Sequence, residues 1–279
     1  MFYYTEAFQK IKHQPFHARI FWRERVMNME EKLILVAGST PGTQIAADYL
    51  KYLGLTVTNS PCSAVRYLLL DTPAFGPEGR LRGGGSVETL LQELPRDILI
   101  CGGNLNHPAL DGYEAVDFLK DESYLCENAY ITAECALDVA LPYLKRTVRH
   151  CPVLILGWGR IGKCLAQLMK STGADVTVAA RNPNDRAMIH ALGYGALDFD
   201  ELPYCLNHFI LLYNTVPQPI LSAEQLLSCR EDCIKIELAS KNGMESDDVI
   251  IARGLPGIHM PESSGKLIAD TFIRLCYGR

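Results

Sequence analysis

The chain has 279 residues, which is enough for two domains that each bury a core of their own. With 48% hydrophobic and 21% charged residues, a net charge of −5 and no apolar run near the ~18 residues that span a bilayer, it is expected to be a globular cytoplasmic protein, and neither nucleic acid nor a membrane is an expected partner. The ten cysteines form no C-x-x-C pair, so free thiols are expected and a metal site is not.

The N-terminal half begins with a segment that mixes aromatic and charged side chains and lacks the continuous apolar core of a secretory signal. Residues 1–30 are therefore expected to form an N-terminal extension. Short apolar runs then alternate with helical patterns, at residues 33–37, 54–58, 67–70 and 98–101. Strands that alternate with helices indicate a parallel sheet. This pattern predicts a flavodoxin-like, doubly wound α/β domain on the substrate side, over residues 31–129.

A connector helix is predicted next, because apolar side chains recur at helical spacing between residues 130 and 144. We assign residues 130–150 to this connector. Glu134 then lies in the first turn of the helix, where an acidic side chain has two interpretations. It either caps the helix through the macrodipole or accepts a proton from a substrate.

A glycine-rich turn, Gly157-Trp158-Gly159-Arg160-Ile161-Gly162, follows an apolar run and precedes a helical pattern. In this context G-x-G-x-x-G is a dinucleotide-binding fingerprint. The first glycine permits the tight turn, the second lets the backbone approach a pyrophosphate, and the third lets the helix pack on the strand. A P-loop is disfavoured because Cys164 stands where magnesium binding needs a hydroxyl. All six residues are predicted to bind cofactor, within a Rossmann NAD(P)-binding domain over residues 151–260.

The end of the next predicted strand bears on the choice of cofactor. NAD sites usually place an acidic residue there to bind the ribose 2′-hydroxyl, but this strand runs into Arg181 and Asn182. A guanidinium suits a 2′-phosphate, so NADP is favoured and NAD is the alternative. Asn214, Thr215 and Val216 follow a later strand and are expected to contact the ribose or the nicotinamide.

Two further predicted strands, at residues 233–238 and 249–252, also end in loops rich in Asn, Ser, Pro and Gly. Ligands of open α/β sheets bind outside the carboxyl ends of the strands, so these loops are candidate parts of a site. Residues 261–279 are predicted to form a helix that returns to the N-terminal domain. The predicted fold class is α/β, with two doubly wound parallel-sheet domains, the C-terminal one a Rossmann domain.

Several motifs occur together in this order: Asn128 with Thr132-Ala133-Glu134, the glycine-rich turn, Asn214-Thr215-Val216-Pro217, Glu237-Leu238-Ala239-Ser240, and Gly254-Leu255-Pro256-Gly257 with Pro261 and Gly265. From about Glu122 to the C-terminus they resemble the A subunit of dipicolinate synthase. The NAD(P)-binding domain of that family resembles D-isomer-specific 2-hydroxyacid dehydrogenases. Over residues 33–110 the resemblance is weaker and covers only the order of strands and loops.

The resemblance implies an NADP-dependent enzyme of bacterial spore formation, which oxidises a dihydro- or hydroxytetrahydro-dipicolinate to pyridine-2,6-dicarboxylate by hydride transfer. The expected partners are this small dicarboxylate substrate, further copies of the chain, and a flavoprotein-like second subunit. Glu134 resembles a family position and is the candidate proton acceptor. Ser240 and Lys241 are further candidate catalytic residues.

A dicarboxylate needs cationic or N–H donors at both ends. Ser263 and Ser264, at the start of the last helix, are candidates for one carboxylate, and Lys241 or Arg253 for the other. The alternatives are that Ser263 only caps the helix and that the two cations are solvated loop charges. The full set of candidate substrate-binding residues is Asn128, Thr132, Arg253, Pro256, Gly257, Ser263 and Ser264.

Two other functions stay open. D-2-hydroxyacid dehydrogenases clamp the substrate carboxylate with an Arg after the corresponding strand and transfer protons with a Glu and a His. Here Ser240 and Lys241 stand near that position, and His259 is the only late histidine, so this function is disfavoured. The other is a non-catalytic NADP-binding regulatory subunit, which turnover by the purified chain would distinguish from an enzyme.

Overall fold

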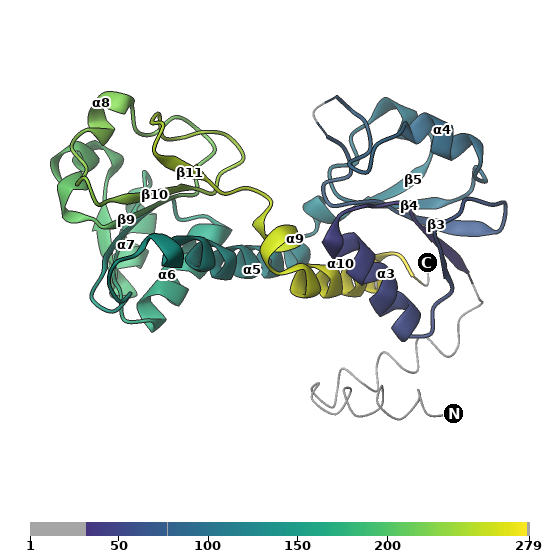
Figure 1. Cartoon of the computed structure of the whole chain (residues 1–279), viewed down its shortest axis with the longest axis horizontal. Helices are drawn as coiled ribbons and strands as arrows, with labels where there is room; N and C mark the ends of the chain where they lie inside the picture. The colour runs from purple at the N-terminus through teal and green to yellow at the C-terminus, as the bar shows by residue number, and fades with distance from the viewer. Residues whose placement is uncertain (1–31, 77, 278–279) are drawn as a thin grey trace. The chain divides into compact units, whose positions relative to one another are not determined.

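A computed structural model of the chain describes residues 32–76 and 78–277, and the predicted extension of residues 1–30 lies outside these ranges. The described residues form two compact units. The first comprises the chain up to Asp121 and beyond Ser264, and the second comprises the segment between them. Each unit is built on a parallel sheet (Figure 1), which confirms the predicted α/β class with two parallel-sheet domains.

The sheet of the first unit has five parallel strands in the order β2-β1-β3-β4-β5. The strands are β1 (Leu33–Val36), β2 (Val57–Thr58), β3 (Val65–Leu69), β4 (Leu99–Gly102) and β5 (Glu114–Asp117). The helical elements are α3 (Pro41–Tyr52), α4 (Val87–Gln92), the C-terminal part of α10 (Pro261–Leu275), and the 3-10 turns η2 (Pro108–Leu110) and η3 (Phe118–Lys120). Helices α3 and α10 lie on one side of the sheet and α4 on the other (Figure 1), as expected of a doubly wound domain.

Helix α10 packs closely on the first unit. A side chain at Gly265 would begin only 2.7 Å from the carbonyl oxygen of Gly42 in α3, so glycine permits this approach. Further along, the ring of Phe272 meets that of Tyr67 edge to face, with centroids 5.4 Å apart, and both side chains are buried. The C-terminal helix therefore shares the core of the N-terminal sheet.

The second unit has six parallel strands in the order β11-β10-β9-β6-β7-β8. The strands are β6 (Pro152–Leu156), β7 (Asp175–Ala179), β8 (Gly195–Leu197), β9 (Leu211–Asn214), β10 (Ile234–Glu237) and β11 (Val249–Ile251). Numbered from β6, this order is the 3-2-1-4-5-6 order of dinucleotide-binding domains, which confirms the predicted Rossmann domain. Its helical elements are α5 (Glu122–Ala140), α6 (Arg160–Ser171), α7 (Pro183–Ala191), α8 (Ala223–Leu226), α9 (Leu255–His259) and the 3-10 turns η4 (Leu141–Tyr143), η5 (Phe199–Tyr204) and η6 (Leu206–His208).

Helix α5 differs from the connector expected over residues 130–150, because it begins at Glu122 and ends at Ala140. Polar residues obscured its start in the sequence. Asn128 is half-buried and Thr132 is buried, so the side of the helix that faces the protein is not uniformly apolar. The hydroxyl of Thr132 donates a 2.7 Å hydrogen bond to the carbonyl of Asn128, which satisfies a polar group that would otherwise be buried alone.

Across the described ranges, no helix is long and apolar enough to cross a membrane. Nor do three or more His, Cys, Asp or Glu side chains gather there in a way that could hold a metal ion. All ten cysteines fall within these ranges and are free thiols.

Candidate nucleotide site

The glycine-rich turn has the geometry that its sequence predicts. Gly157 follows β6 with a φ of +101°, a conformation that favours glycine. A side chain at Gly162 would begin 2.2 Å from the carbonyl oxygen of Gly157, whereas one at Gly159 would meet nothing within 4 Å. Helix α6 then starts at Arg160 without a side-chain cap. The turn therefore combines a tight reversal, open space over Gly159 and uncapped N–H groups, which are the features that hold a pyrophosphate.

Side chains from other elements brace this turn. Thr215, just after β9, donates a 2.8 Å hydrogen bond from its hydroxyl to the carbonyl of Leu156. A side chain at Gly157 would begin 2.7 Å from both the Thr215 hydroxyl and the Val216 side chain, so these groups press directly on the turn. The structure thus brings the predicted residues of the β6–α6 and β9 loops together. The hydroxyl of Thr215 positions the turn, and the contact of Thr215 with a cofactor stays a prediction.

Arg160 and Trp158 both have side-chain partners within the second unit. The Arg160 guanidinium binds both carboxylate oxygens of Glu122 at 2.7 and 2.8 Å, which raises its pKa and ties the start of α6 to the start of α5. The Trp158 ring meets that of Tyr194 edge to face at 6.0 Å, and the ammonium of Lys163 lies 5.8 Å from the Trp158 centroid. Cys164 is the residue that disfavours a P-loop in the sequence. Its side chain is half-buried, and burial raises the pKa of its thiol.

At the tip of β7 the chain carries Arg181 where NAD sites usually have an acidic residue. Arg181 is exposed, and no ion pair among the described residues includes it. Its backbone is fixed by Arg186, whose Nη1 donates to the carbonyls of Ala180 and Arg181 at 2.8 and 2.7 Å. Arg186 also forms a 2.6 Å ion pair with Asp198. The turn is therefore braced while the side chain of Arg181 stays accessible.

Asn182 has a local role. It caps α7, with its side-chain oxygen accepting a 2.9 Å hydrogen bond from the backbone N–H of Asn184. The side chain of Asn182 is thus engaged in capping α7. A contact between Asn182 and a cofactor stays a prediction.

A buried polar cluster holds the loops after β9 and β10. Glu237 and Asn214 are both fully buried, and Asn214 Nδ2 donates to Glu237 Oε1 at 2.8 Å. Glu237 also accepts the backbone N–H groups of Ala239 at 3.1 Å and Gly243 at 2.8 Å. Asn214 bonds the N–H and the carbonyl of Val216, each at 3.0 Å. The amide nitrogen and the amide oxygen of Asn214 thus both have partners within the protein, and the contact of Asn214 with a cofactor stays a prediction.

Arg253 is exposed, and its guanidinium also bonds the loop after β10. Its Nε donates to the carbonyl of Ala239 at 2.8 Å, and another guanidinium nitrogen donates to the side chain of Asn242. Arg253 thus holds the loop after β10, and its role in substrate binding stays a prediction. Ser240 and Lys241 lie exposed in that loop.

The remaining candidates lie on α5, α9 and the first turn of α10. Glu134 is half-buried in the middle of α5, far from its start, so capping by the macrodipole does not apply to it. Pro256 is buried and Gly257 half-buried in α9.

Ser263 and Ser264 follow Pro261 within the first turn of α10, so neither stands at the N-cap position. No described hydrogen bond or ion pair joins Glu134 to the loop after β10, so their shared role stays a prediction.

The structure shows a histidine–carboxylate pair that we did not predict. His259 Nδ1 lies 2.8 Å from Asp138 Oδ2, with His259 in α9 and Asp138 in α5. A carboxylate that holds one ring nitrogen fixes the orientation of the imidazole and leaves Nε2 for proton transfer. In the sequence, only His259 pointed to a proton-transferring group in this region. Its partner lies 121 positions away and is brought close by the packing of α9 on α5.

The strand order, the glycine-rich turn and the braced tip of β7 together define a domain of the Rossmann, NAD(P)-binding type. No protein-family model matches the chain. Over 156 residues it is 29% identical to the A subunit of dipicolinate synthase of Bacillus subtilis (strain 168), a stretch that covers 53% of this chain and 52% of that protein. The alignment thus spans about half the length of this curated relative.

Solved structures share the fold over most of the chain. The dipicolinate synthase A subunit from Bacillus halodurans matches with a TM-score of 0.75 and 21% identity, covering 88% of this chain and 98% of the other. Its counterpart from Bacillus subtilis matches with 0.72 and 21%, covering 88% and 96%. A transhydrogenase from Sinorhizobium meliloti matches with 0.70 and 12%, covering 91% and 87%. The predicted resemblance to the family of dipicolinate synthase A subunits is confirmed.

The cluster around Glu237 yields a test of how these loops are held. Glu237→Gln replaces one acceptor oxygen by a donor that faces N–H groups, so we expect the free energy of unfolding to fall by about 1.5–3 kcal/mol. Urea unfolding followed by circular dichroism measures this change. The matched control is Glu245→Gln, because Glu245 is exposed near the same loop. Equal stability of the two variants would contradict a stabilising role for the buried carboxylate.

Proposed function

We propose that the chain is an NADP-dependent oxidoreductase that converts a dihydro- or hydroxytetrahydro-dipicolinate to pyridine-2,6-dicarboxylate. The observation that carries this proposal is the β6–α6 turn, open over Gly159, next to a β7 tip that ends in Arg181. The choice of substrate rests on the similarity to the dipicolinate synthase A subunit. We further propose a cytoplasmic role in bacterial spore formation, with a homo-oligomeric state and a flavoprotein-like second subunit.

Successive loops of the second unit fit successive parts of a dinucleotide. The N–H groups at the start of α6 would hold the pyrophosphate, and Arg181 the 2′-phosphate. The loop of Thr215 and Val216, braced by the cluster around Glu237, would flank the ribose or the nicotinamide through its backbone and the Val216 side chain. When bound, the nicotinamide supplies a hydride acceptor for the oxidation.

Forming an aromatic pyridine from the dihydro acid requires the loss of a proton as well as a hydride, and the hydroxytetrahydro acid must in addition lose one molecule of water. Two groups of the second unit are candidates for the proton acceptor. Glu134 is half-buried in α5, and His259 is oriented by Asp138. For the substrate carboxylates we favour Ser263, Ser264 and Lys241 over Arg253, because the Arg253 guanidinium already bonds the loop after β10.

The histidine–carboxylate pair also favours a second candidate function. D-2-hydroxyacid dehydrogenases use a histidine with an acidic partner, and the pair of His259 and Asp138 supplies such a combination. The loop after β10 nevertheless presents Ser240 and Lys241 where those enzymes carry an arginine. We therefore place this function second, and binding of dipicolinate or of D-lactate separates the two.

The cofactor assignment is tested by Arg181→Asp. We expect NADP affinity to fall by about 10- to 100-fold, since one charge-assisted contact of about 1.5–3 kcal/mol is lost, while NAD affinity stays equal or rises. Titration of both dinucleotides by calorimetry measures this. The control is Arg149→Asp, which changes an exposed arginine on the amino side of β6. If the parent binds both dinucleotides equally and Arg181→Asp changes neither affinity, the role of Arg181 is refuted.

The proton acceptor is identified by comparing Glu134→Gln with His259→Gln. The variant that removes the acceptor should lower turnover about 100-fold or more and keep NADP affinity. If His259 is the acceptor, Asp138→Asn should lower turnover too, because the imidazole loses its orienting carboxylate. Steady-state NADPH formation gives the rates. Near-normal turnover in all three variants would remove both candidates.

The substrate assignment is tested by thermal unfolding of the NADP-bound chain with added acids. Dipicolinate should stabilise the protein, pyridine-2-carboxylate should stabilise it less, and D-lactate should have no effect. At 100 times the dissociation constant the gain approaches ~2.7 kcal/mol, which is easily resolved. Protection by D-lactate without protection by dipicolinate would favour the hydroxyacid dehydrogenase function. Protection by dipicolinate without turnover by the chain, alone or with a second subunit, would favour the regulatory role.

A further inference from the structure

Two cysteines of the second unit, Cys229 and Cys233, lie on either side of a short turn. Cys229 follows α8, and Cys233 directly precedes Ile234, the first residue of β10. The backbone N–H of Cys233 donates a 3.1 Å hydrogen bond to the carbonyl of Arg230, which closes the turn between them. The turn brings the two side chains together, and the thiols are in hydrogen-bonding contact with each other.

Both cysteines pack on one apolar cluster of the second unit, which includes Leu226 and Val249. Cys233 is buried within the cluster, whereas Cys229 is half-buried at its edge. Close packing holds side chains in fixed positions. The two sulfur atoms are therefore kept in contact, and one of them is open to a small molecule from solvent.

The turn between the two cysteines is fixed by charged side chains. Arg230 Nε lies 2.7 Å from Asp232 Oδ1, and Arg230 Nη2 lies 3.2 Å from Asp232 Oδ2, so the guanidinium binds both carboxylate oxygens. Arg146 lies 3.5 Å from the same carboxylate. These contacts hold the chain reversal that places Cys229 beside Cys233.

The two thiols differ in acidity. Their contact lowers the pKa of Cys229 and raises the pKa of Cys233, so Cys229 is the thiol that ionises and Cys233 donates its S–H to it. The buried ammonium of Lys235, which pairs with Asp248 at 2.6 Å, also favours the thiolate of Cys229. The accessible cysteine is thus the nucleophilic one, and the buried cysteine is its neighbour.

Two other thiols provide the comparison. Cys164 and Cys205 are half-buried as Cys229 is, but burial raises the pKa of each. Exposure alone therefore does not distinguish Cys229. Its distinguishing features are the contact with Cys233 and the nearby ammonium.

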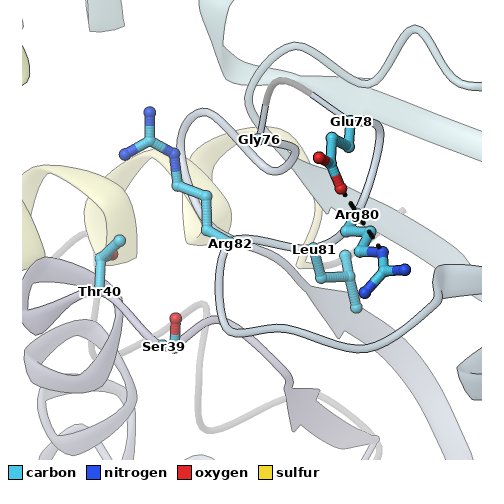
Figure 2. Close-up of a pocket in the computed structure, with 7 residues that line it drawn as sticks. All are labelled: Ser39, Thr40, Gly76, Glu78, Arg80, Leu81 and Arg82. Carbon is cyan, nitrogen blue, oxygen red and sulfur yellow. Dashed lines mark ion pairs between the residues drawn. The ribbon is translucent and has the colours of Figure 1, made fainter.

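The pair is separate from the places where ligands are expected. It lies at the amino end of β10, whereas the nucleotide site is formed by loops at the carboxyl ends of the strands. In the first unit, a hollow of about 660 Å³ lies between the loops after β1 and β3, and its described lining includes no cysteine (Figure 2). The thiol pair therefore has a chemistry of its own.

We propose that Cys229 and Cys233 form a redox-active dithiol that a peroxide oxidises to an intramolecular disulfide. The Cys229 thiolate attacks one peroxide oxygen, the O–O bond breaks, and Cys229 becomes a sulfenic acid while the other oxygen takes up a proton and leaves as water. The sulfur of Cys233 then attacks Cys229 Sγ and forms the S–S bond. The sulfenic hydroxyl leaves with the Cys233 proton as a second water, so the two thiols lose two electrons and the peroxide gains them.

The disulfide forms between groups that already touch, so it requires little movement of α8 or β10. It closes only a short loop and therefore constrains the unfolded chain little, unlike a disulfide that serves to stabilise a fold. A dithiol reductant should restore both cysteines by exchange. The proposal goes beyond the proposed function and does not depend on it.

The test is oxidation of the full chain with an equimolar amount of hydrogen peroxide, followed by unfolding in N-ethylmaleimide to block the remaining thiols. Cleavage after Glu224 and Arg230, by a glutamate-specific protease and trypsin, places the two cysteines on separate peptides, residues 225–230 and 231–235. A disulfide links these peptides, and mass spectrometry without reduction detects the link. We expect the pair to be oxidised at least about tenfold faster than Cys205.

Variants separate the two roles. Cys233→Ser should leave Cys229 as a sulfenic acid, which dimedone traps, whereas Cys229→Ser should leave Cys233 reduced at the same dose of peroxide. The matched control is Cys205→Ser, which should form the disulfide at the rate of the parent. The comparison of the pair with Cys205 is made in the parent itself, so it holds even if a variant does not fold.

Three outcomes overturn the proposal. They are oxidation of Cys229 no faster than that of Cys205, a disulfide from either cysteine to a different thiol, and conversion of Cys229 in the parent to a sulfinic acid without a disulfide. A parent that forms the disulfide but binds no dinucleotide would support the dithiol and refute the cofactor assignment.

Discussion

Buried carboxylates hold the loops at the carboxyl ends of both sheets. Glu237, at the end of β10, accepts the backbone N–H groups of Ala239 and Gly243, and Asp71, just after β3, accepts those of Ser39 and Thr40. These N–H groups lie in loops where no strand supplies an acceptor. A charged acceptor makes stronger hydrogen bonds than a neutral one, so each carboxylate fixes its loop without regular secondary structure.

Both carboxylates depend on a glycine at close range. A side chain at Gly243 would begin 2.2 Å from Asn214 Nδ2, and one at Gly38 would begin 2.6 Å from Asp71 Oδ1. Neither glycine is there for its φ angle, because neither has a positive value. They are required because no other residue leaves room for the backbone to close around the carboxylate. The two units thus share one local solution, although their sheets differ in strand number and order.

The parts of the structure that the sequence predicts are local. The strand, turn and helix around Gly157 lie within about twenty consecutive residues, and each glycine has a distinct steric task that the spacing reveals. The start of α5 was not predicted correctly, since Asn128 and Thr132 interrupt the apolar periodicity by which a helix is recognised in a sequence.

The side-chain partners at the candidate site are not local, and this is why the sequence did not reveal them. Asn214 bonds Glu237, Arg253 bonds the carbonyl of Ala239, and His259 pairs with Asp138. In each case the residue type is visible in the sequence, but the group that forms a hydrogen bond with its side chain comes from another element. Whether a polar side chain is free for a ligand depends on these distant partners, which the sequence does not identify.

The pairing of Arg186 with Asp198 has a consequence for how such a site diverges among relatives. Arg186 neutralises this carboxylate and at the same time bonds the backbone of Arg181. Replacing Arg186 by a neutral residue would release a negative charge beside the tip of β7 and loosen its backbone in a single step. Under the role proposed for Arg181, a change in coenzyme preference would then arise without any substitution in the fingerprint motif or at Arg181 itself, and comparisons of those positions alone would miss it.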